Sequence, residues 1–390
     1  MEPEKVQQCI DAHFFGVNTS RYCSTLIYEG DKVLTPMGPN LVLWDMKTLS
    51  RVRIIQESQS LIMCLFENSS VIASVSYSGD IVFFDKKTLK VIDRIKTQQI
   101  LIRHGAMNED FIAICAEEGK AGGVTEVFDI RCLKKDSSMK GIEKVLHLEG
   151  RWRYPALTDN GTLFITKERR IYEPGVKEDD YPAEPKGPQG PKPFKRDYTY
   201  HNFSLETKKE TCEPVAGNLV ADIINASSNE RDRVALVYLT RRVVILNSKT
   251  LEVLYNVNIG EAGAIVGSRF DEYSVFLSPK SNFLLEIKAE KAAKLPEDTV
   301  VDYKQYLDKD DDPHFRTFQL QSLGLCPKNY SFIWNKKYET AVTCNEDGIF
   351  LLDFKAKKAR EISLFSITCC GLALSHVNNL NWVHCLKGIC

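Results

Sequence analysis

The 390-residue chain lacks the short motifs by which common enzyme classes are recognised. It contains no nucleophile elbow of the form Gly-x-Ser-x-Gly, no phosphate-binding P-loop and no dinucleotide-binding glycine pattern. Its seven histidines include no His-Glu-x-x-His pair or other spacing typical of metal ligands. We therefore expect a protein without catalytic activity, resident metal or cofactor.

The chain also lacks an excess of charge and a long apolar run. Lysine and arginine number 51 against 52 aspartates and glutamates, which leaves a net charge of −1. This balance argues against a dedicated nucleic-acid binder, although it leaves a local basic patch possible. No apolar run long enough to span a membrane and no signal peptide are visible, so we expect an intracellular protein, cytoplasmic or nuclear, that does not bind membranes.

Cysteine is abundant, but its spacing carries no metal or disulfide pattern. The twelve cysteines are scattered, and none forms a Cys-x-x-Cys pair. Several fall in apolar stretches that read as strands, namely Cys64, Cys115, Cys344, Cys369 and Cys370. In an intracellular chain such residues are expected to be buried free thiols that act as small hydrophobic groups.

What the chain does have is one segment that occurs three times, at 41–52, 81–92 and 243–254. Each copy has four apolar residues, then Asp or Asn, then any residue, then Lys-Thr-Leu. Asp45 and Asp85 are 40 residues apart, and Asn247 follows Asp85 after 162 residues, close to four such steps. A recurring period of this length with strand-forming residues predicts a fold built from repeated β-units.

The chemistry of each copy predicts a hairpin between two strands. The apolar run fits a strand buried on both faces, and the Asp or Asn oxygen can accept a backbone N–H two residues on, which favours a turn. Upstream of the second copy, 60–66 and 71–77 read as two further strands. Four strands in about 40 residues, joined by hairpins, are typical of one blade of a β-propeller.

We accordingly predict an all-β chain forming a single β-propeller over residues 1–390. The predicted units are 20–58, 59–98, 99–150, 151–215, 216–262, 263–322 and 323–366. A strand at 5–15 and two more at 367–374 and 380–386 remain at the ends, and we expect the two termini to share a blade that closes the ring. Seven blades are favoured, and eight are possible.

These segments resemble the WD-repeat β-propeller family. Trp44-Asp45 is the one true Trp-Asp pair, and Phe84-Asp85, Phe128-Asp129 and Leu352-Asp353 occupy the corresponding places. The family's Gly-His pair has no counterpart here. The resemblance implies a ring scaffold that binds other proteins or peptides.

Two stretches depart from the repeat and read as loop insertions. The first, 173–197, holds six of the chain's 15 prolines among lysines and glycines, and proline cannot continue a sheet ladder. It is either a passive surface loop or an arm that docks a partner. The second, 292–315, is acidic, and we expect a solvated loop there.

Three clusters are candidate partner-binding residues. The sequence Phe128-Asp129-Ile130-Arg131 resembles the WDxR box of propellers that serve as substrate receptors of cullin-RING ubiquitin ligases, in which the Arg contacts the adaptor propeller of the ligase. Arg151, Trp152 and Arg153 combine cations with an aromatic ring, as interface anchors do. The remaining candidates lie at the end of the proline-rich insertion: Lys192, Phe194, Lys195 and Arg196.

The function that these features favour is a non-catalytic adaptor within an intracellular protein complex. Two alternatives stay open. One is the ubiquitin-ligase receptor, which depends on Arg131. The other is a propeller that binds RNA or belongs to an RNA-processing assembly, for which Lys195, Arg196 and the lysines of the insertion could contact phosphate.

Overall fold

The structure is a computed structural model. It describes residues 26–28, 31–45, 47–48, 50–118, 122–134, 140–175, 194–217, 223–229, 233–238, 242–260, 265–270, 274–279, 283–288, 299–302, 305, 315–319, 331–335, 340–344, 349–353, 358–361, 372–377 and 380–385. Two compact units divide the chain. A terminal unit combines residues 1–62 with 320–390, and a central unit spans residues 63–319.

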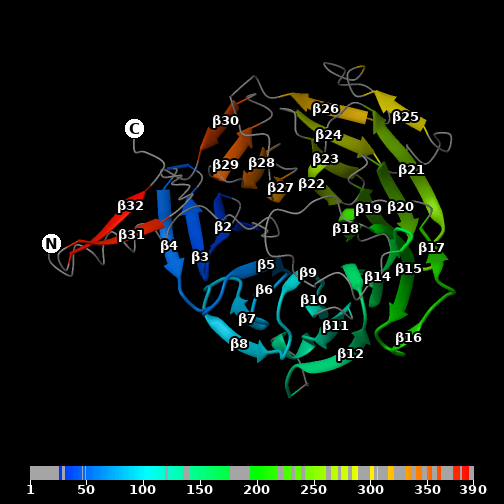
Figure 1. Cartoon of the computed structure of the whole chain (residues 1–390), viewed down its shortest axis with the longest axis horizontal. Coiled ribbons are helices and arrows are strands. Elements are labelled where there is room, and N and C mark those ends of the chain that lie inside the picture. Colours follow the sequence, from blue (N-terminus) through cyan, green and yellow to red (C-terminus); the bar gives the residue numbers. More distant parts are fainter. Residues whose placement is uncertain are drawn as a thin grey trace. The chain divides into compact units, whose positions relative to one another are not determined.

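The central unit contains five sheets that follow one another in chain order (Figure 1). Sheets are numbered along the chain, so the first sheet belongs to the terminal unit and the central unit begins with the second. The second sheet has β5 (Ile62–Glu67), β6 (Val71–Ser76), β7 (Asp80–Asp85) and β8 (Val91–Lys96). The third has β9 (Ile102–Met107), β10 (Phe111–Glu118), β11 (Gly122–Asp129) and β12 (Glu143–Glu149). The fourth has β13 (Trp152–Leu157), β14 (Thr162–Tyr172), β15 (Phe194–Ser204), β16 (Lys209–Glu210) and β17 (Val215–Ala216).

The last two sheets of this unit share an unusual connection. The fifth sheet has β18 (Ile223–Asn229), β19 (Arg233–Tyr238), β20 (Arg242–Asn247) and β21 (Val253–Gly260), and the sixth has β22 (Ile265–Phe270), β23 (Ser274–Pro279), β24 (Phe283–Lys288) and β26 (Phe315–Gln319). Between β24 and β26, strand β25 (Thr299–Asp302) pairs in parallel with β21 and so joins the fifth sheet. Part of the predicted acidic insertion 292–315 is therefore an edge strand.

The terminal unit contains two four-stranded sheets and a two-stranded one. The first sheet has β1 (Leu26–Tyr28), β2 (Lys32–Met37), β3 (Asn40–Asp45) and β4 (Ser50–Ile55). The seventh has β27 (Ser331–Asn335), β28 (Thr340–Cys344), β29 (Ile349–Asp353) and β30 (Lys358–Glu361), and β1 contacts β27. Strands β31 (Leu372–Val377) and β32 (Leu380–Cys385) pair only with each other among the described residues.

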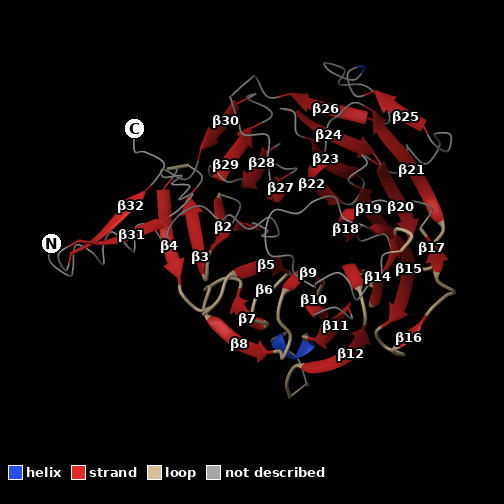
Figure 2. Cartoon of the chain, in the orientation of Figure 1, coloured by secondary structure: helices blue, strands red, loops and turns tan. Residues whose placement is uncertain are grey.

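The all-β prediction is confirmed, because the described chain is strand, turn and loop apart from a 3₁₀ turn at Arg131–Leu133 and a single 3₁₀ residue, Gln305 (Figure 2). Each of the seven predicted units contains four strands of one sheet, and β25 of the sixth unit is added to the fifth sheet. The predicted strand at 5–15 lies outside the described residues. A blade shared between the termini, and the choice between seven and eight blades, therefore remain predictions.

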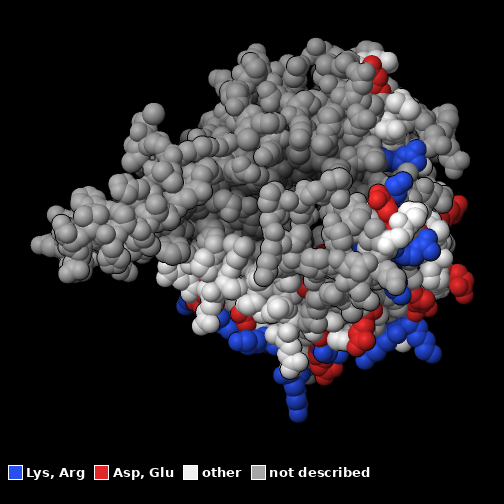
Figure 3. All heavy atoms as spheres, in the orientation of Figure 1, with Lys and Arg blue, Asp and Glu red and all other residues white. Residues whose placement is uncertain are grey.

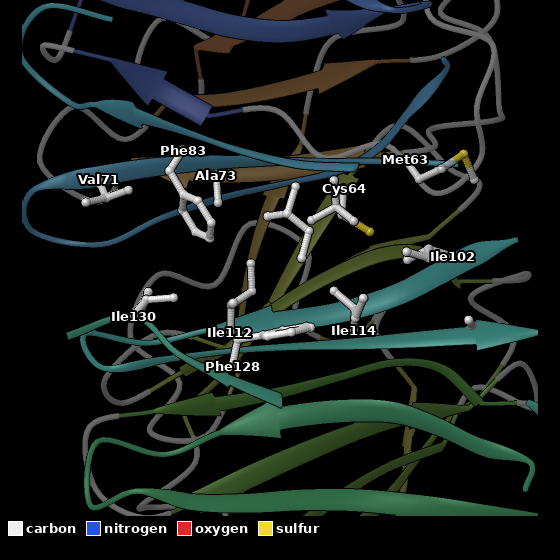
Figure 4. Packing of buried hydrophobic residues seen from close by; sticks show 13 residues of the cluster. Met63, Cys64, Val71, Ala73, Phe83, Ile102, Ile112, Ile114, Phe128 and Ile130 are labelled. Carbon is white, nitrogen blue, oxygen red and sulfur yellow. The ribbon is translucent and has the colours of Figure 1, made fainter. Parts of the chain in front are cut away.

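Apolar side chains on the faces of neighbouring sheets hold the central unit together. Figure 4 shows Phe83 of β7 directed toward Ile112 and Phe128 of the third sheet. A second cluster joins the third and fourth sheets around Leu163 and Ile165, and a third joins the fourth and fifth around Phe164. The third and fourth sheets are buried on both faces because each packs between two others, which explains their continuous apolar runs.

The repeated Asp or Asn forms the same turn in all three copies. The side-chain oxygen of Asp45 accepts the backbone N–H groups of Lys47 and Thr48, each at 2.8 Å. Asp85 and Asn247 accept the corresponding pairs of N–H groups. The hydrogen bond from Thr48, followed by that from Lys47, holds the pKa of Asp45 below its ordinary value. The predicted turn chemistry is confirmed.

Replacing the acceptor should weaken this turn, whereas exchanging one acceptor for another should not. We expect Asp85→Ala to lower the free energy of unfolding by about 1 to 2 kcal/mol, by analogy with the loss of a side-chain cap. Asp85→Asn should stay within about 0.5 kcal/mol, because Asn247 makes the same turn. Urea unfolding of the two variants tests this prediction. Equal losses of unfolding free energy would show that the side-chain oxygen at position 85 does not stabilise the turn.

A second set of contacts keeps neighbouring sheets in register at the turn between their first two strands. The Asn68 side-chain amide donates to the backbone oxygen of Asn108 at 3.4 Å, and the Asn108 amide donates to Thr158 at 2.7 Å. Ser69 donates through its backbone N–H and hydroxyl to the Glu109 carboxylate. The turns of the second, third and fourth sheets are thus linked in sequence.

Candidate functional site

The most distinctive surface feature is the hairpin of β14 and β15. Each strand has 11 residues, whereas most strands of the chain have six or fewer. Pairing with β13 ends at Lys167, and pairing with β17 ends at Thr199. The remaining residues, 168–172 and 194–198, pair with each other as a two-stranded ribbon, which we call the distal ribbon. Among the described strands, none pairs with Arg169 to Tyr172 except β15.

This hairpin contains the end of the predicted insertion 173–197. Strand β15 begins at Phe194, so the last four residues of that segment are strand, and Phe194 lies directly opposite Tyr172. Residues 176–193, including the candidate Lys192, lie outside the described part of the chain. The proline-rich segment is therefore connected at both ends to the distal ribbon.

One face of the ribbon consists of an ion network around an aromatic ring. Arg170 and Arg196 lie directly opposite each other, a like-charge arrangement that is unfavourable by itself. Glu168, whose side chain is only 4 % exposed, compensates by contacting Arg170 at 3.0 Å and Arg196 at 3.6 Å. The Phe194 ring centre lies 4.6 Å from the Arg170 guanidinium and 6.0 Å from that of Arg196. Arg170 and Arg196, the cations of this face, therefore make their contacts within the ribbon.

The charge state of Arg170 follows from these contacts. Burial acts to lower the pKa of Arg170, but its interactions with Tyr172 and Glu168 outweigh burial and raise the pKa above its ordinary value. The guanidinium therefore stays charged at every pH at which the protein is folded. Arg196 and Phe194, two of the predicted contact residues, thus stabilise the ribbon.

The opposite face of the ribbon carries exposed cations, and it continues to Lys167, where β14 still pairs with β13. On β14 this face contains Lys167, Arg169 and Ile171, which alternate along the strand with Glu168 and Arg170 of the other face. On β15 it contains Asp197, opposite Arg169, and Lys195, opposite Ile171. Arg169, 73 % exposed, pairs with Asp197 at 2.6 Å. The Lys167 amine lies 5.1 Å from the Trp152 ring centre, and Lys195 is exposed. We call these five residues the cationic face.

The WDxR-like segment lies at the end of β11. Phe128 is buried in the cluster between the second and third sheets, and the Asp129 side chain is 3 % exposed. Arg131 donates its backbone N–H and its Nε to Asp129, each at 3.0 Å, while half of its side chain stays exposed. The hydrogen bond to Asp129 raises the pKa of Arg131 above its ordinary value. Of this trio only Arg131 presents its side chain to solvent.

The Arg151–Arg153 cluster lies at the start of β13, and two of its members face inward. The Trp152 indole N–H donates to the backbone oxygen of Glu149 at 2.9 Å. The Arg153 guanidinium donates to the backbone oxygen of Trp152 and pairs with Glu117 of β10 at 3.1 Å. Arg151 is the partly exposed member. Trp152 and Arg153 therefore connect the fourth sheet to the third.

Cys115 of β10 is a buried thiol, as the sequence predicts. The Thr125 hydroxyl on β11 donates to its sulfur at 3.1 Å. Burial raises the pKa of Cys115 to about 12, although the Thr125 hydrogen bond and the charge of Arg153 act in the opposite direction. The thiol therefore stays protonated in the folded protein at physiological pH.

This raised pKa predicts a loss of stability in alkali. In the unfolded chain the thiol ionises near its ordinary pKa of 9.0, whereas in the folded chain it keeps its proton to about 12. Above pH 9 the unfolded state binds fewer protons, so the free energy of unfolding falls by up to about 1.4 kcal/mol per pH unit. Urea unfolding at pH 8 and pH 10 should show a larger decrease for the native chain than for Cys115→Ala. Equal decreases in the unfolding free energy of the two proteins would contradict this prediction.

His201 of β15 is hydrogen-bonded on both ring nitrogens. Its Nε2 lies 2.7 Å from the Thr199 hydroxyl, and its Nδ1 lies 2.8 Å from the Glu210 carboxylate. The order of hydroxyl, imidazole and carboxylate resembles a catalytic triad. However, the His201 ring is buried against Trp152 and Phe203. The arrangement therefore attaches β16 to β15 rather than offering a base to a substrate.

The described residues also lack the side-chain groups that typically hold a metal ion. No group of three or more histidine, cysteine or acidic side chains is placed to hold a metal ion there. None of the described helices is long and apolar enough to span a membrane. Figure 3 shows lysine and arginine mixed with acidic side chains over the described part of one face, without a large area of one sign.

Comparison with known proteins identifies the fold. No family model matches the sequence, and no curated protein matches it significantly. Among solved structures, Sqt1 of Saccharomyces cerevisiae is 9 % identical with a TM-score of 0.51, covering 93 % of this chain and 90 % of Sqt1. The computationally designed Ika8 protein is 12 % identical with a TM-score of 0.53, covering 88 % of each chain. Hsv2 of Kluyveromyces lactis, at 11 % identity and a TM-score of 0.48, covers 96 % of this chain and 97 % of its own.

Sqt1 is a WD-repeat β-propeller, and the similarity spans nearly the whole chain. The chain is a β-propeller. Its repeated four-stranded sheets are blades of this fold, and the buried hydrogen bond from the Trp44 indole to the Thr35 hydroxyl lies in the blade with the one Trp-Asp pair. At such low identity the similarity establishes only the fold. A function has to be argued from the residues of the candidate site.

Proposed function

We propose that this propeller is a non-catalytic scaffold that binds partner proteins through the distal ribbon and the segment it carries. The observation that supports this most is the ribbon itself, which extends past β13 and β17 and continues into the proline-rich residues. Rigid propeller blades commonly carry variable loops, and such loops are where binding residues concentrate.

The ribbon is suited to docking because its base is rigid. Tyr198 is almost fully buried where the ribbon leaves the sheet, and the Glu168 network fixes the two strands to each other. A partner that binds an arm of fixed shape pays little conformational entropy for ordering it. Proline in the connected segment reduces that entropy further.

The test removes the segment and keeps the ribbon. Because Tyr172 lies opposite Phe194, residues 173–193 can be replaced by an Asn-Gly turn that closes the hairpin. Affinity purification of the tagged native and shortened chains, with quantitative mass spectrometry, should show that the shortened chain loses stoichiometric partners. A control with Glu206→Ala and Thr207→Ala, in the turn that follows β15, should keep them. Recovery of the same proteins by the shortened chain would refute the proposal.

Arg131 supports a second candidate, the substrate receptor of a cullin-RING ubiquitin ligase. Asp129 holds the guanidinium in a fixed orientation while half of the side chain remains exposed, which suits a pre-organised contact to an adaptor. Arg131→Ala should abolish co-purification of the ligase adaptor, while Lys134→Ala, at the other end of the same short turn, should not. Unchanged adaptor recovery by Arg131→Ala would dismiss this candidate.

A further inference from the structure

We propose that the cationic face of the distal ribbon binds an extended acidic peptide segment of a partner protein. This inference rests on the proposed function and names the chemistry of the partner. It concerns Lys167, Arg169, Ile171, Lys195 and Asp197, of which only Lys195 was among the residues singled out from the sequence.

Strand register separates the charges of the ribbon onto two faces. Glu168 and Arg170 point to one side, opposite Tyr198 and Arg196, and the Glu168 carboxylate there pairs with both arginines. The cationic face has three cations and a single carboxylate, that of Asp197, which is 17 % exposed and paired with Arg169. Two lysines therefore remain on this face without a carboxylate from the ribbon. The ligand that complements them is an anion.

The spacing of the cations favours an extended chain as the ligand. Lys195 lies opposite Ile171, which is four residues beyond Lys167 along β14. At about 3.4 Å per residue, the two lysine positions are about 14 Å apart along the strand direction. An extended peptide with carboxylates at positions i and i+4 has the same spacing. Ile171, 42 % exposed next to Lys195, adds an apolar contact that suits an aliphatic or aromatic side chain of the peptide.

The same residues argue for a peptide over a nucleic acid. Single-stranded nucleic acids are usually held by aromatic rings on which bases stack, together with cations that contact phosphate. The three aromatic residues of the ribbon, Tyr172, Phe194 and Tyr198, lie on the other face. Tyr198 is buried, the Tyr172 and Phe194 rings are 5.4 Å apart, and Phe194 packs against Arg170. The cationic face instead offers an aliphatic side chain between cations, which matches an acidic peptide.

Fluorescence anisotropy tests the inference on the full-length protein. The probe is a fluorescein-labelled 12-residue peptide of alternating Glu and Leu, and its control has every Glu replaced by Gln. The native chain should bind the Glu peptide, lose it with rising salt and not bind the Gln peptide. The double variant Lys167→Glu/Lys195→Glu should bind about tenfold more weakly or worse. Lys208→Glu/Lys209→Glu, at the opposite end of β15, should bind normally.

Three outcomes would overturn the inference: unchanged binding by the Lys167→Glu/Lys195→Glu variant, equal binding of the Gln peptide, or tighter binding of a labelled 12-nucleotide RNA that this variant abolishes. A circular dichroism spectrum identical to that of the native chain shows that the variant is folded. If the shortened chain without residues 173–193 loses its partners although the double variant keeps the peptide, the proposed function stands and this inference fails. If the shortened chain keeps all partners, the proposed function fails regardless of the peptide result.

Discussion

Replacing Phe83 with alanine is expected to lower the free energy of unfolding by about 3 to 5 kcal/mol. The Phe83 ring is fully buried between the second and third sheets, where Figure 4 shows it close to Ile112 and Ile130. Removing it leaves a cavity between the two sheets, into which the surrounding side chains relax only in part. Urea unfolding followed by tryptophan fluorescence measures the loss.

The matched control is Ile92→Ala on β8, the neighbouring strand of the same sheet. Ile92 is 44 % exposed, so its truncation removes little buried area, and the expected loss is below about 1 kcal/mol. A loss below about 1 kcal/mol for Phe83→Ala as well would mean that the two sheets do not pack as described.

The second large effect is expected for Glu168→Gln, which keeps the shape of the side chain and removes its charge. Arg170 and Arg196 would then face each other across the ribbon without compensation. Breaking a buried ion pair by removing one partner costs about 3 to 5 kcal/mol, and the partial exposure of the two arginines reduces this to about 2 to 4 kcal/mol. Urea unfolding of the purified variant measures the cost.

The control for this prediction is Asp197→Asn, which removes the partner of Arg169 on the other face. Arg169 is 73 % exposed, so water screens this pair, and its loss should cost less than about 1 kcal/mol. Similar costs for the two variants would contradict the distinction between a structural face and a cationic face, on which the peptide inference depends.

Local chemistry made the repeat predictable from sequence. The turn at Asp45, Asp85 and Asn247 depends on residues within three positions of one another, so a recurring segment was enough to predict the hydrogen bond from the backbone N–H two residues on. The continuous apolar runs predicted strands buried on both faces, and the structure contains one sheet in each predicted unit.

The distal ribbon was harder to predict because it depends on strand pairing far apart in sequence. Residues 169–172 are the end of β14, although the repeated segment has no copy there, and Phe194 to Asp197 read as insertion because of the prolines before them. The face on which each cation lies follows only from the register between β14 and β15. For this reason Lys167, Arg169 and the compensating Glu168 were not identified.

Tertiary packing also decides which members of a motif are exposed. Phe128, Trp152 and Arg153 belong to short patterns that suggest contacts, and their side chains lie in the interior. The position of β25 is a further example, because a parallel strand added from the next unit leaves no periodic signal in its own residues.

Hydrogen exchange across the ribbon tests the account most directly, because both the scaffold proposal and the peptide inference require β14 and β15 to stay paired beyond the rest of the sheet. Mass spectrometry of the native chain should find that peptides covering 169–172 and 194–197 exchange far more slowly than an unstructured peptide of the same sequence. Exchange of both segments at the unstructured rate would show that the ribbon is not folded, and the docking proposals would then have no structural basis.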